Sequence, residues 1–123
     1  KRGSGKIILI DDEKIIRISG SLILKNMGYD VNTFENGLEA IEFFRDHYNE
    51  TDLVITDMIM PEINGSELFY RLKEIDPECN VLLSSGFTRD EDVDSLRSDG
   101  LAGFINKPFR DIELYNLIST ILN

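Results

Sequence analysis

Residues 6–14 read KIILIDDEK, a run of four aliphatic residues that passes directly into three carboxylates. A continuous apolar run of this length is typical of a strand that is covered on both faces of a sheet. Such a strand would deliver Asp11 and Asp12 to the edge of the protein interior, where adjacent negative charges repel each other. The stretch therefore predicts a buried strand with an unusual concentration of charge at its carboxyl end.

Short apolar runs recur along the chain and alternate with patterns of helical spacing. We predict strands at residues 6–10, 30–34, 53–56, 81–84 and 103–106. The run at 30–34 alternates between polar and apolar residues, as expected for an edge strand. Five strands alternating with five helices predict an α/β fold, a doubly wound parallel sheet with helices on both faces.

Apolar residues at helical spacing mark the helices between these strands. The first stripe ends at Gly28, a residue that commonly terminates a helix. The fourth helix pattern, within residues 88–100, has only two clear apolar anchors, which indicates a locally weak element. The stripes comprise Ile15, Ile18 and Leu22 with Ile23 and Met27; Ile41, Phe44 and Tyr48; Leu68, Leu72 and Ile75; Val93 and Leu96; and Leu114, Leu117, Ile118 and Ile121.

Polar groups follow the predicted strands, and the carboxyl ends of parallel strands meet at one edge of a sheet. Clustered carboxylates repel unless a hard cation lies among them, and Mg2+ (or Mn2+) takes oxygen ligands while keeping waters that a phosphate can replace. One carboxylate could then act as a nucleophile and form an acyl phosphate. We expect these groups to converge: Asp11, Asp12, Asp57, Lys107 and a hydroxyl of Ser84 or Ser85.

Composition narrows the possible functions. The chain has 123 residues and a net charge of −10, which disfavours nucleic-acid binding. No apolar stretch is long enough to span a membrane, and the single cysteine suits a reducing, cytoplasmic compartment. Residues 1–5 are interpreted as a linker or cloning remnant, and residues 6–123 as one domain.

Four fragments in order, each at a predicted strand end, resemble the response-regulator receiver domain of bacterial two-component signalling. The resemblance covers residues 6–122 and implies the flavodoxin-like strand order 2-1-3-4-5. It also implies that the domain catalyses only its own phosphorylation and dephosphorylation, rather than turning over metabolites. The fragments are Asp11-Asp12, DMIMPEINGSEL (residues 57–68), Ser85-Gly86 and Lys107-Pro108-Phe109.

The resemblance assigns a role to each residue of the site. Asp57 would accept a phosphoryl group from a histidine kinase or a phosphotransfer domain. Asp12 would bind Mg2+ directly and Asp11 mainly through water, together with Asp57 and the main-chain carbonyl of Ile59. Lys107 would pair with the phosphoryl oxygens and, before phosphorylation, with Asp57.

A conformational switch is also implied by the resemblance. Counting back from Gly100, the glycine before the fifth strand, selects Ser85 as the switch hydroxyl, and Phe104 would swing inward in response. The peptide bond between Lys107 and Pro108 is often cis in this family. We expect two apolar residues near the phosphoryl group, Ile59 and Phe87, to shield the acyl phosphate and lengthen its lifetime.

The expected output is a contact with a downstream protein or a linked domain, made by the fourth helix, the fifth strand and the last helix. The opening GSGKIILIDDE (residues 3–13) resembles the join to a receiver at the end of a hybrid sensor histidine kinase, which would make this domain the cytoplasmic part of a membrane-bound kinase.

Three alternatives remain open from the sequence. A flavodoxin-like FMN carrier would need a hydroxyl- and glycine-rich loop after the first strand, where this chain has acids. A phosphatase of the haloacid-dehalogenase type should carry a second aspartate at the position of Ile59. A receiver that acts as a scaffold without phosphorylation is disfavoured by intact Asp57 and Lys107.

Overall fold

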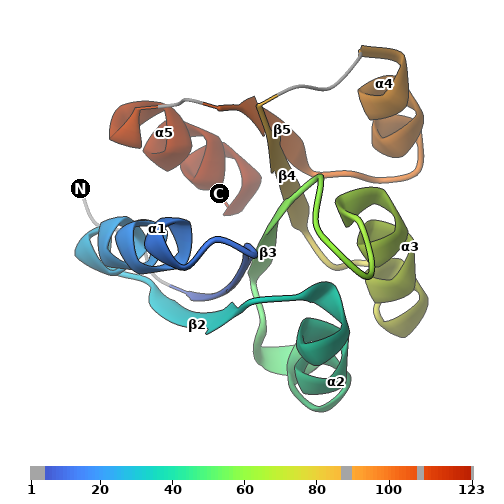
Figure 1. The fold of residues 1–123 in the computed structure, drawn as a ribbon, viewed down its shortest axis with the longest axis horizontal. Helices are drawn as coiled ribbons and strands as arrows, with labels where there is room; N and C mark the ends of the chain where they lie inside the picture. Colours follow the sequence, from blue (N-terminus) through green and yellow to red (C-terminus); the bar gives the residue numbers. More distant parts are fainter. Residues whose placement is uncertain (1–4, 87–89, 108–109, 123) are drawn as a thin grey trace.

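The computed structural model describes residues 5–86, 90–107 and 110–122. Its strands form one parallel sheet in the order β2-β1-β3-β4-β5, which confirms the predicted fold class and strand order (Figure 1). The strands are β1 (Lys6–Ile10), β2 (Asp30–Phe34), β3 (Leu53–Asp57), β4 (Val81–Ser85) and β5 (Gly103–Asn106). The helices are α1 (Lys14–Asn26), α2 (Gly37–His47), α3 (Gly65–Ile75), α4 (Asp90–Ser98) and α5 (Asp111–Leu122), with a 3-10 turn at Tyr48–Glu50.

Some of the sequence-based expectations concern residues outside the described ranges. They are the first four residues of the linker expected at 1–5, the tuning role of Phe87 and the Lys107–Pro108 peptide bond. The side chains of residues 90–92 are likewise not described, so the anchoring of α4 is judged from its second half.

Helices cover both faces of the sheet, α1 and α5 on one and α2, α3 and α4 on the other (Figure 1). Each face has its own apolar core, because side chains alternate between the two faces along every strand. The larger cluster joins the sheet to Phe44 of α2, Phe69 of α3 and Leu96 of α4. The second joins it to Leu24 of α1 and to Ile118 of α5.

Burial along the strands follows the prediction. β1 lies between β2 and β3, and four of its five residues are buried. β2 lies at an edge of the sheet and has no fully buried residue, which confirms that the run at 30–34 is an edge strand. The central strands are therefore buried on both faces. The residues that follow their carboxyl ends lie together at one edge of the sheet.

The leading residues of the first apolar stripe do not face the core, although an amphipathic stripe normally does. α1 instead buries Leu24 and packs Ile23 and Met27 against the sheet. The absence of a side chain at Gly20 lets this side approach closely, since a Cβ there would lie 3.0 Å from Leu9 Cδ2. α1 has apolar residues on two of its sides. The prediction from spacing led with the side that is exposed. The exposed fractions are 72% for Ile15, 49% for Ile18 and 59% for Leu22.

The remaining stripes mostly face the core as their spacing predicts. Tyr48 is an exception, because α2 ends before it and its side chain is exposed. The buried members are Ile41 and Phe44 in α2, Leu68 and Leu72 in α3, Val93 and Leu96 in α4, and Leu114 and Ile118 in α5.

Candidate functional site

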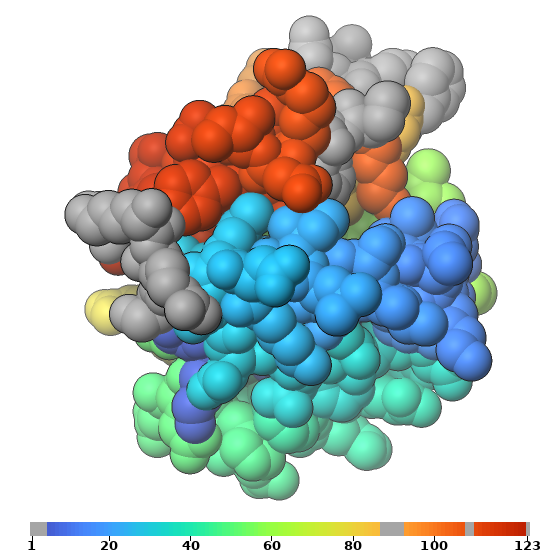
Figure 2. Space-filling model, turned by 90° about the vertical axis from the view of Figure 1, so that its left-hand side faces the viewer, coloured from blue at the N-terminus to red at the C-terminus, as the bar shows by residue number. Residues whose placement is uncertain are grey.

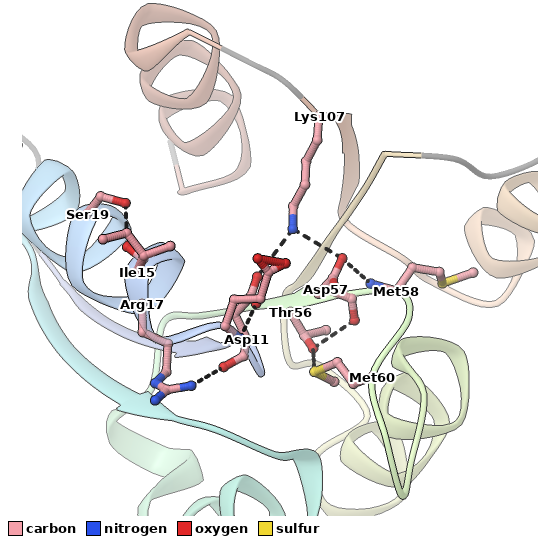
Figure 3. Close-up of polar contacts among 10 residues, drawn as sticks. Asp11, Ile15, Arg17, Ser19, Thr56, Asp57, Met58, Met60 and Lys107 are labelled. Atoms are coloured by element: carbon pink, nitrogen blue, oxygen red, sulfur yellow. Dashed lines mark hydrogen bonds and ion pairs between the residues drawn. The ribbon is translucent and has the colours of Figure 1, made fainter.

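Three carboxylates meet beyond the carboxyl ends of β1 and β3. Figure 3 shows two of them, those of Asp11 and Asp57, pointing toward Lys107. One oxygen from each of Asp11, Asp12 and Asp57 lies within 4.8 Å of the others, so a single ion could contact all three. Asp11 is buried, Asp12 is exposed and Asp57 is partly exposed, so the cluster opens toward solvent on one side. The convergence of the three acids predicted from the strand ends is thus observed.

Lys107, which follows β5, brings a positive charge into this cluster. Its Nζ lies 3.3 Å from Asp11 Oδ2 and 3.4 Å from Asp57 Oδ1. The main-chain N–H of Lys107 donates to the carbonyl oxygen of Ser85 at 2.8 Å, which ties the lysine to the end of β4. The ammonium group therefore bridges two carboxylates, the expected contact with Asp57 among them.

Main-chain donors orient the two inner carboxylates. The N–H of Glu13 donates to Asp11 Oδ1 at 2.9 Å, and the N–H of Met58 donates to Asp57 Oδ1 at 3.0 Å. Within the described residues, the second oxygen of Asp57, Oδ2, accepts no hydrogen bond. Asp57 is therefore held by one oxygen while the other is available to an incoming group.

The site contains three carboxylates and one ammonium group, so its negative charges outnumber its positive charge. Burial raises the pKa of Asp57, and the neighbouring charge of Asp11 adds to this effect, while Lys107 and the Met58 N–H oppose it. Burial by itself would lower the pKa of Lys107, but Asp11 and Asp57 together outweigh it and the pKa is raised. The lysine thus stays protonated, and Asp57 still resists ionisation beside it. A divalent cation would supply the missing positive charge, and three carboxylates suit a hard cation such as Mg2+.

We expect Asp57→Asn to raise the thermal unfolding midpoint at neutral pH in the absence of divalent cations. Because the folded-state pKa of Asp57 is raised, ionising this group costs stability, a cost that begins as the pH rises through the unfolded-state pKa and is complete above the raised folded-state pKa. The advantage of the variant should therefore vanish below about pH 4, the ordinary range of an aspartate. Unfolding curves between pH 3 and pH 8 would measure it, and an equal or lower midpoint at pH 7 would contradict it.

The remaining predicted residues lie around this cluster. Ser85 is buried at the end of β4, whereas Ser84 lines a cavity together with Asp11 and Lys107. Phe104 is half-buried against the core cluster of α2, α3 and α4. Ile59 projects outward, with 66% of its surface exposed.

Two residues that shape the site were missed by the sequence-based reasoning. Gly65, the first residue of α3, donates from its N–H to the carbonyl oxygen of Met58 at 2.7 Å. A Cβ at Gly65 would lie 2.6 Å from the main-chain oxygen of Asp57. Arg17 of α1 donates from Nη1 to the carbonyl oxygen of Asp11 at 2.7 Å. An Asn-Gly pair marks the start of α3 in the sequence, but nothing in the sequence signals either close approach.

The fold and this cluster define a class of signalling domain, a parallel α/β domain with an acidic pocket and a lysine at the strand ends. The chain belongs to the response regulator receiver domain family, whose model matches residues 7–119. It is 33% identical to the response regulator receiver protein CpdR of Brucella abortus, over 95% of this chain and 96% of that protein.

Two further relatives place the chain in the same family. It is 32% identical to the sensor kinase CckA of Brucella abortus over 98% of this chain, but it spans only 13% of that kinase. The crystal structure of a response regulator receiver domain protein from Clostridium thermocellum superposes with a TM-score of 0.92 at 28% identity, covering 97% of this chain and 94% of that one.

The chain is thus a receiver domain of two-component signalling, like the chemotaxis protein CheY, to which it is 30% identical in the Bacillus subtilis form. Membership of this family excludes the two alternatives drawn from other families, the FMN carrier and the phosphatase. Receiver domains bind Mg2+ through an acidic pocket, and the three clustered aspartates are such a pocket. None of the described helices is long and apolar enough to cross a bilayer.

Proposed function

We propose that Asp57 of this receiver accepts a phosphoryl group from a phosphohistidine, with Mg2+ bound by Asp11, Asp12, Asp57 and the main-chain carbonyl of Ile59. The observation that supports this proposal is the convergence of three acids and Lys107 at the strand ends. A scaffold with no phosphoryl chemistry would gain nothing from a cluster whose like charges oppose the ionisation of Asp57.

The arrangement of the residues suits transfer by direct displacement. Oδ2 of Asp57 attacks phosphorus while the Met58 N–H holds Oδ1. The bond between phosphorus and the histidine nitrogen breaks, its electron pair passes to the imidazole ring, and an acyl phosphate forms on Asp57. The Lys107 ammonium, already between Asp11 and Asp57, binds the phosphoryl oxygens. Bound Mg2+ would neutralise the negative charge that gathers around the phosphoryl group.

The phosphorylated state would act as a signal and not as an intermediate of metabolite turnover. In this proposal Ser85 binds the new phosphoryl group and Phe104 responds by moving further inward. Ile59 carries no group that could orient an attacking water, so with Phe87 it would slow hydrolysis of the acyl phosphate. Phe104 is half-buried, so an inward movement would take more of its side chain out of solvent.

Acetyl phosphate provides a direct test that needs no partner protein. We expect the whole chain to gain the mass of one phosphate when it is incubated with acetyl phosphate and Mg2+, and to gain none when a chelator replaces the metal. Intact-mass spectrometry measures both conditions. If the wild-type chain stays unmodified while a known receiver is labelled in parallel, the proposed function is wrong.

The phosphohistidine donor has to bind beside Asp57, and we place its docking on the exposed side of α1. Ile15, Ile18 and Leu22 form an apolar strip there, and exposed apolar surface next to a reactive group commonly marks a partner site. Figure 2 shows the face of the molecule on which α1 lies beside α5.

We expect Ile18→Asp to slow phosphotransfer from a histidine-phosphorylated donor roughly tenfold, since a charge would be buried in the contact. Uptake from acetyl phosphate should be unchanged, because this small donor needs no docking surface. Leu38→Asp is the matched control, an exposed leucine on α2 at the other face of the sheet. Equal rates from the protein donor for wild type and Ile18→Asp would rule out this docking surface.

For the output, we propose the surface of α4, β5 and α5 as the contact with a downstream protein or linked domain. In the described part of α4, only Val93 and Leu96 are buried, and Ile112 of α5 is largely exposed.

A cytoplasmic location, as part of a hybrid kinase, is supported by the similarity to a segment of the sensor kinase CckA.

A further inference from the structure

Arg17 points its guanidinium group at the main chain of the acidic loop. Its Nη1 donates to the carbonyl oxygen of Asp11 at 2.7 Å, and the side chain is half-buried (Figure 3). Where side chains are described, no carboxylate forms an ion pair with it, although 23 acidic residues give the chain a net charge of −10. Arg17 thus binds a main-chain carbonyl although many carboxylates are present in the chain. This bond fixes the position of the Asp11 backbone.

The loop that Arg17 contacts carries two of the three clustered acids. Only residues 11–13 connect β1 to α1, and Asp11 and Asp12 are the first two of them. The N–H of Asp11 donates to the carbonyl oxygen of Phe34 at 3.2 Å, which attaches the loop to β2.

Few other bonds tie the loop to α1. Glu13, at the N-cap of α1, makes no side-chain capping bond, and the first turn of the helix has no acidic residue. The N–H of Glu13 donates to Asp11 Oδ1 within the loop itself. Arg17 is therefore the side chain of α1 that reaches back to the loop, and it does so at the residue that also bonds Lys107.

We propose that Arg17 is a positioning residue for the divalent cation. Its hydrogen bond to the Asp11 carbonyl fixes the backbone of residues 11–13. The bond thereby orients the carboxylates of Asp11 and Asp12 toward Asp57. This inference rests on the proposed function, because it concerns how the same site binds Mg2+. Mutating a residue that hydrogen-bonds to a metal ligand commonly lowers the metal affinity by about 10- to 100-fold.

Position and charge predict opposite results for the loss of Arg17. The guanidinium is a positive charge beside a cation site, so removing its charge alone would strengthen Mg2+ binding. Removing its hydrogen bond frees the loop and lets the two carboxylates spread apart under their mutual repulsion, which would weaken Mg2+ binding. The sign of the change therefore distinguishes the two roles.

Titration calorimetry of the whole chain with MgCl2 measures this sign. We expect Arg17→Ala to bind Mg2+ about 10-fold more weakly than wild type. Arg17→Lys keeps the charge and a donor and should recover part of the loss. Lys14→Ala removes an equal charge from the exposed start of the same helix, and it should leave Mg2+ binding unchanged or slightly tighter.

Amide exchange in the metal-free state gives a second, independent measurement. We expect the N–H groups of Asp12 and Glu13 to exchange faster in Arg17→Ala, while β3 and β4 keep wild-type protection. This pattern also shows that the variant is folded. If Arg17→Ala binds Mg2+ as tightly as wild type or more tightly, or if Arg17→Lys recovers nothing, the positioning role is wrong.

The two proposals fail in different ways. If wild type itself binds no Mg2+, the proposed function fails and the role of Arg17 falls with it. If wild type binds Mg2+ and gains a phosphate while Arg17→Ala does both equally well, only the role of Arg17 is refuted.

Discussion

Asp57→Asn is expected to abolish phosphoryl uptake from acetyl phosphate, with no gain of mass at any Mg2+ concentration. An amide is a poor nucleophile at its oxygen and cannot form a stable acyl phosphate, so the step is lost entirely. The substitution is nearly isosteric, and the Met58 N–H can still donate to the side-chain oxygen as it does to Asp57 Oδ1. Loss of phosphorylation would thus reflect chemistry and not a change of shape.

Two companion variants make this experiment specific. Asp30→Asn removes an exposed carboxylate at the start of β2, away from the carboxyl ends of the strands, and should be phosphorylated like wild type. Asp12→Asn removes a proposed metal ligand and should still be phosphorylated, but only at raised Mg2+ concentration. A full phosphate gain in Asp57→Asn would mean that another residue is the acceptor, and peptide mapping would then identify it.

The second large effect is expected for stability. Gly65→Ala should lower the free energy of unfolding by about 3 kcal/mol, the upper part of the range for forcing atoms into a packed site. A Cβ at this position would lie 2.6 Å from the Asp57 main-chain oxygen and 2.8 Å from Met58 Cα. Both atoms belong to backbone, which cannot rotate away as the end of a side chain can. Because the displaced backbone carries Asp57, phosphoryl uptake should also become slower.

Other glycines of the chain provide a graded comparison for this variant. Gly37 has the same place in α2 as Gly65 has in α3, directly after an asparagine cap. A Cβ at Gly37 would lie 2.7 Å from Ile63 Cγ2, an atom of a side chain and not of the backbone, so Gly37→Ala should cost less than Gly65→Ala. Gly86→Ala should be almost neutral, since among the described residues the nearest atom to its Cβ would be Lys107 Cβ at 4.0 Å. Denaturant unfolding measures all three, and an equal loss in Gly37→Ala and Gly65→Ala would contradict the backbone argument.

Much of the site could be predicted because parallel strands impose a simple geometry. Once residues 6–10 and 53–56 are recognised as buried strands, the acids that follow them have to meet at one edge of the sheet. The same rule places Lys107 there, because it follows the last strand. In each case the information is local, a run of aliphatic residues and the polar residue that ends it.

Other features depend on contacts between segments that are distant in the sequence. α1 has apolar residues on two sides, and only the shape of the sheet around Leu9 decides that Leu24 is buried while Ile15 and Ile18 are exposed. The pairing of Lys107 with Asp11 as well as Asp57 depends on side-chain positions that no spacing rule provides.

By itself, then, the sequence determined the five strands, their burial and the identity of the converging acids, because these follow from hydrophobic patterns and from the alternation of strands with helices. The tertiary structure alone decided which side of α1 packs on the sheet, how closely Gly65 approaches the backbone of Asp57, and that Arg17 binds the carbonyl of Asp11. The physical reason is that such contacts depend on distances of a few tenths of an ångström between packed segments, and sequence spacing carries no information at that scale.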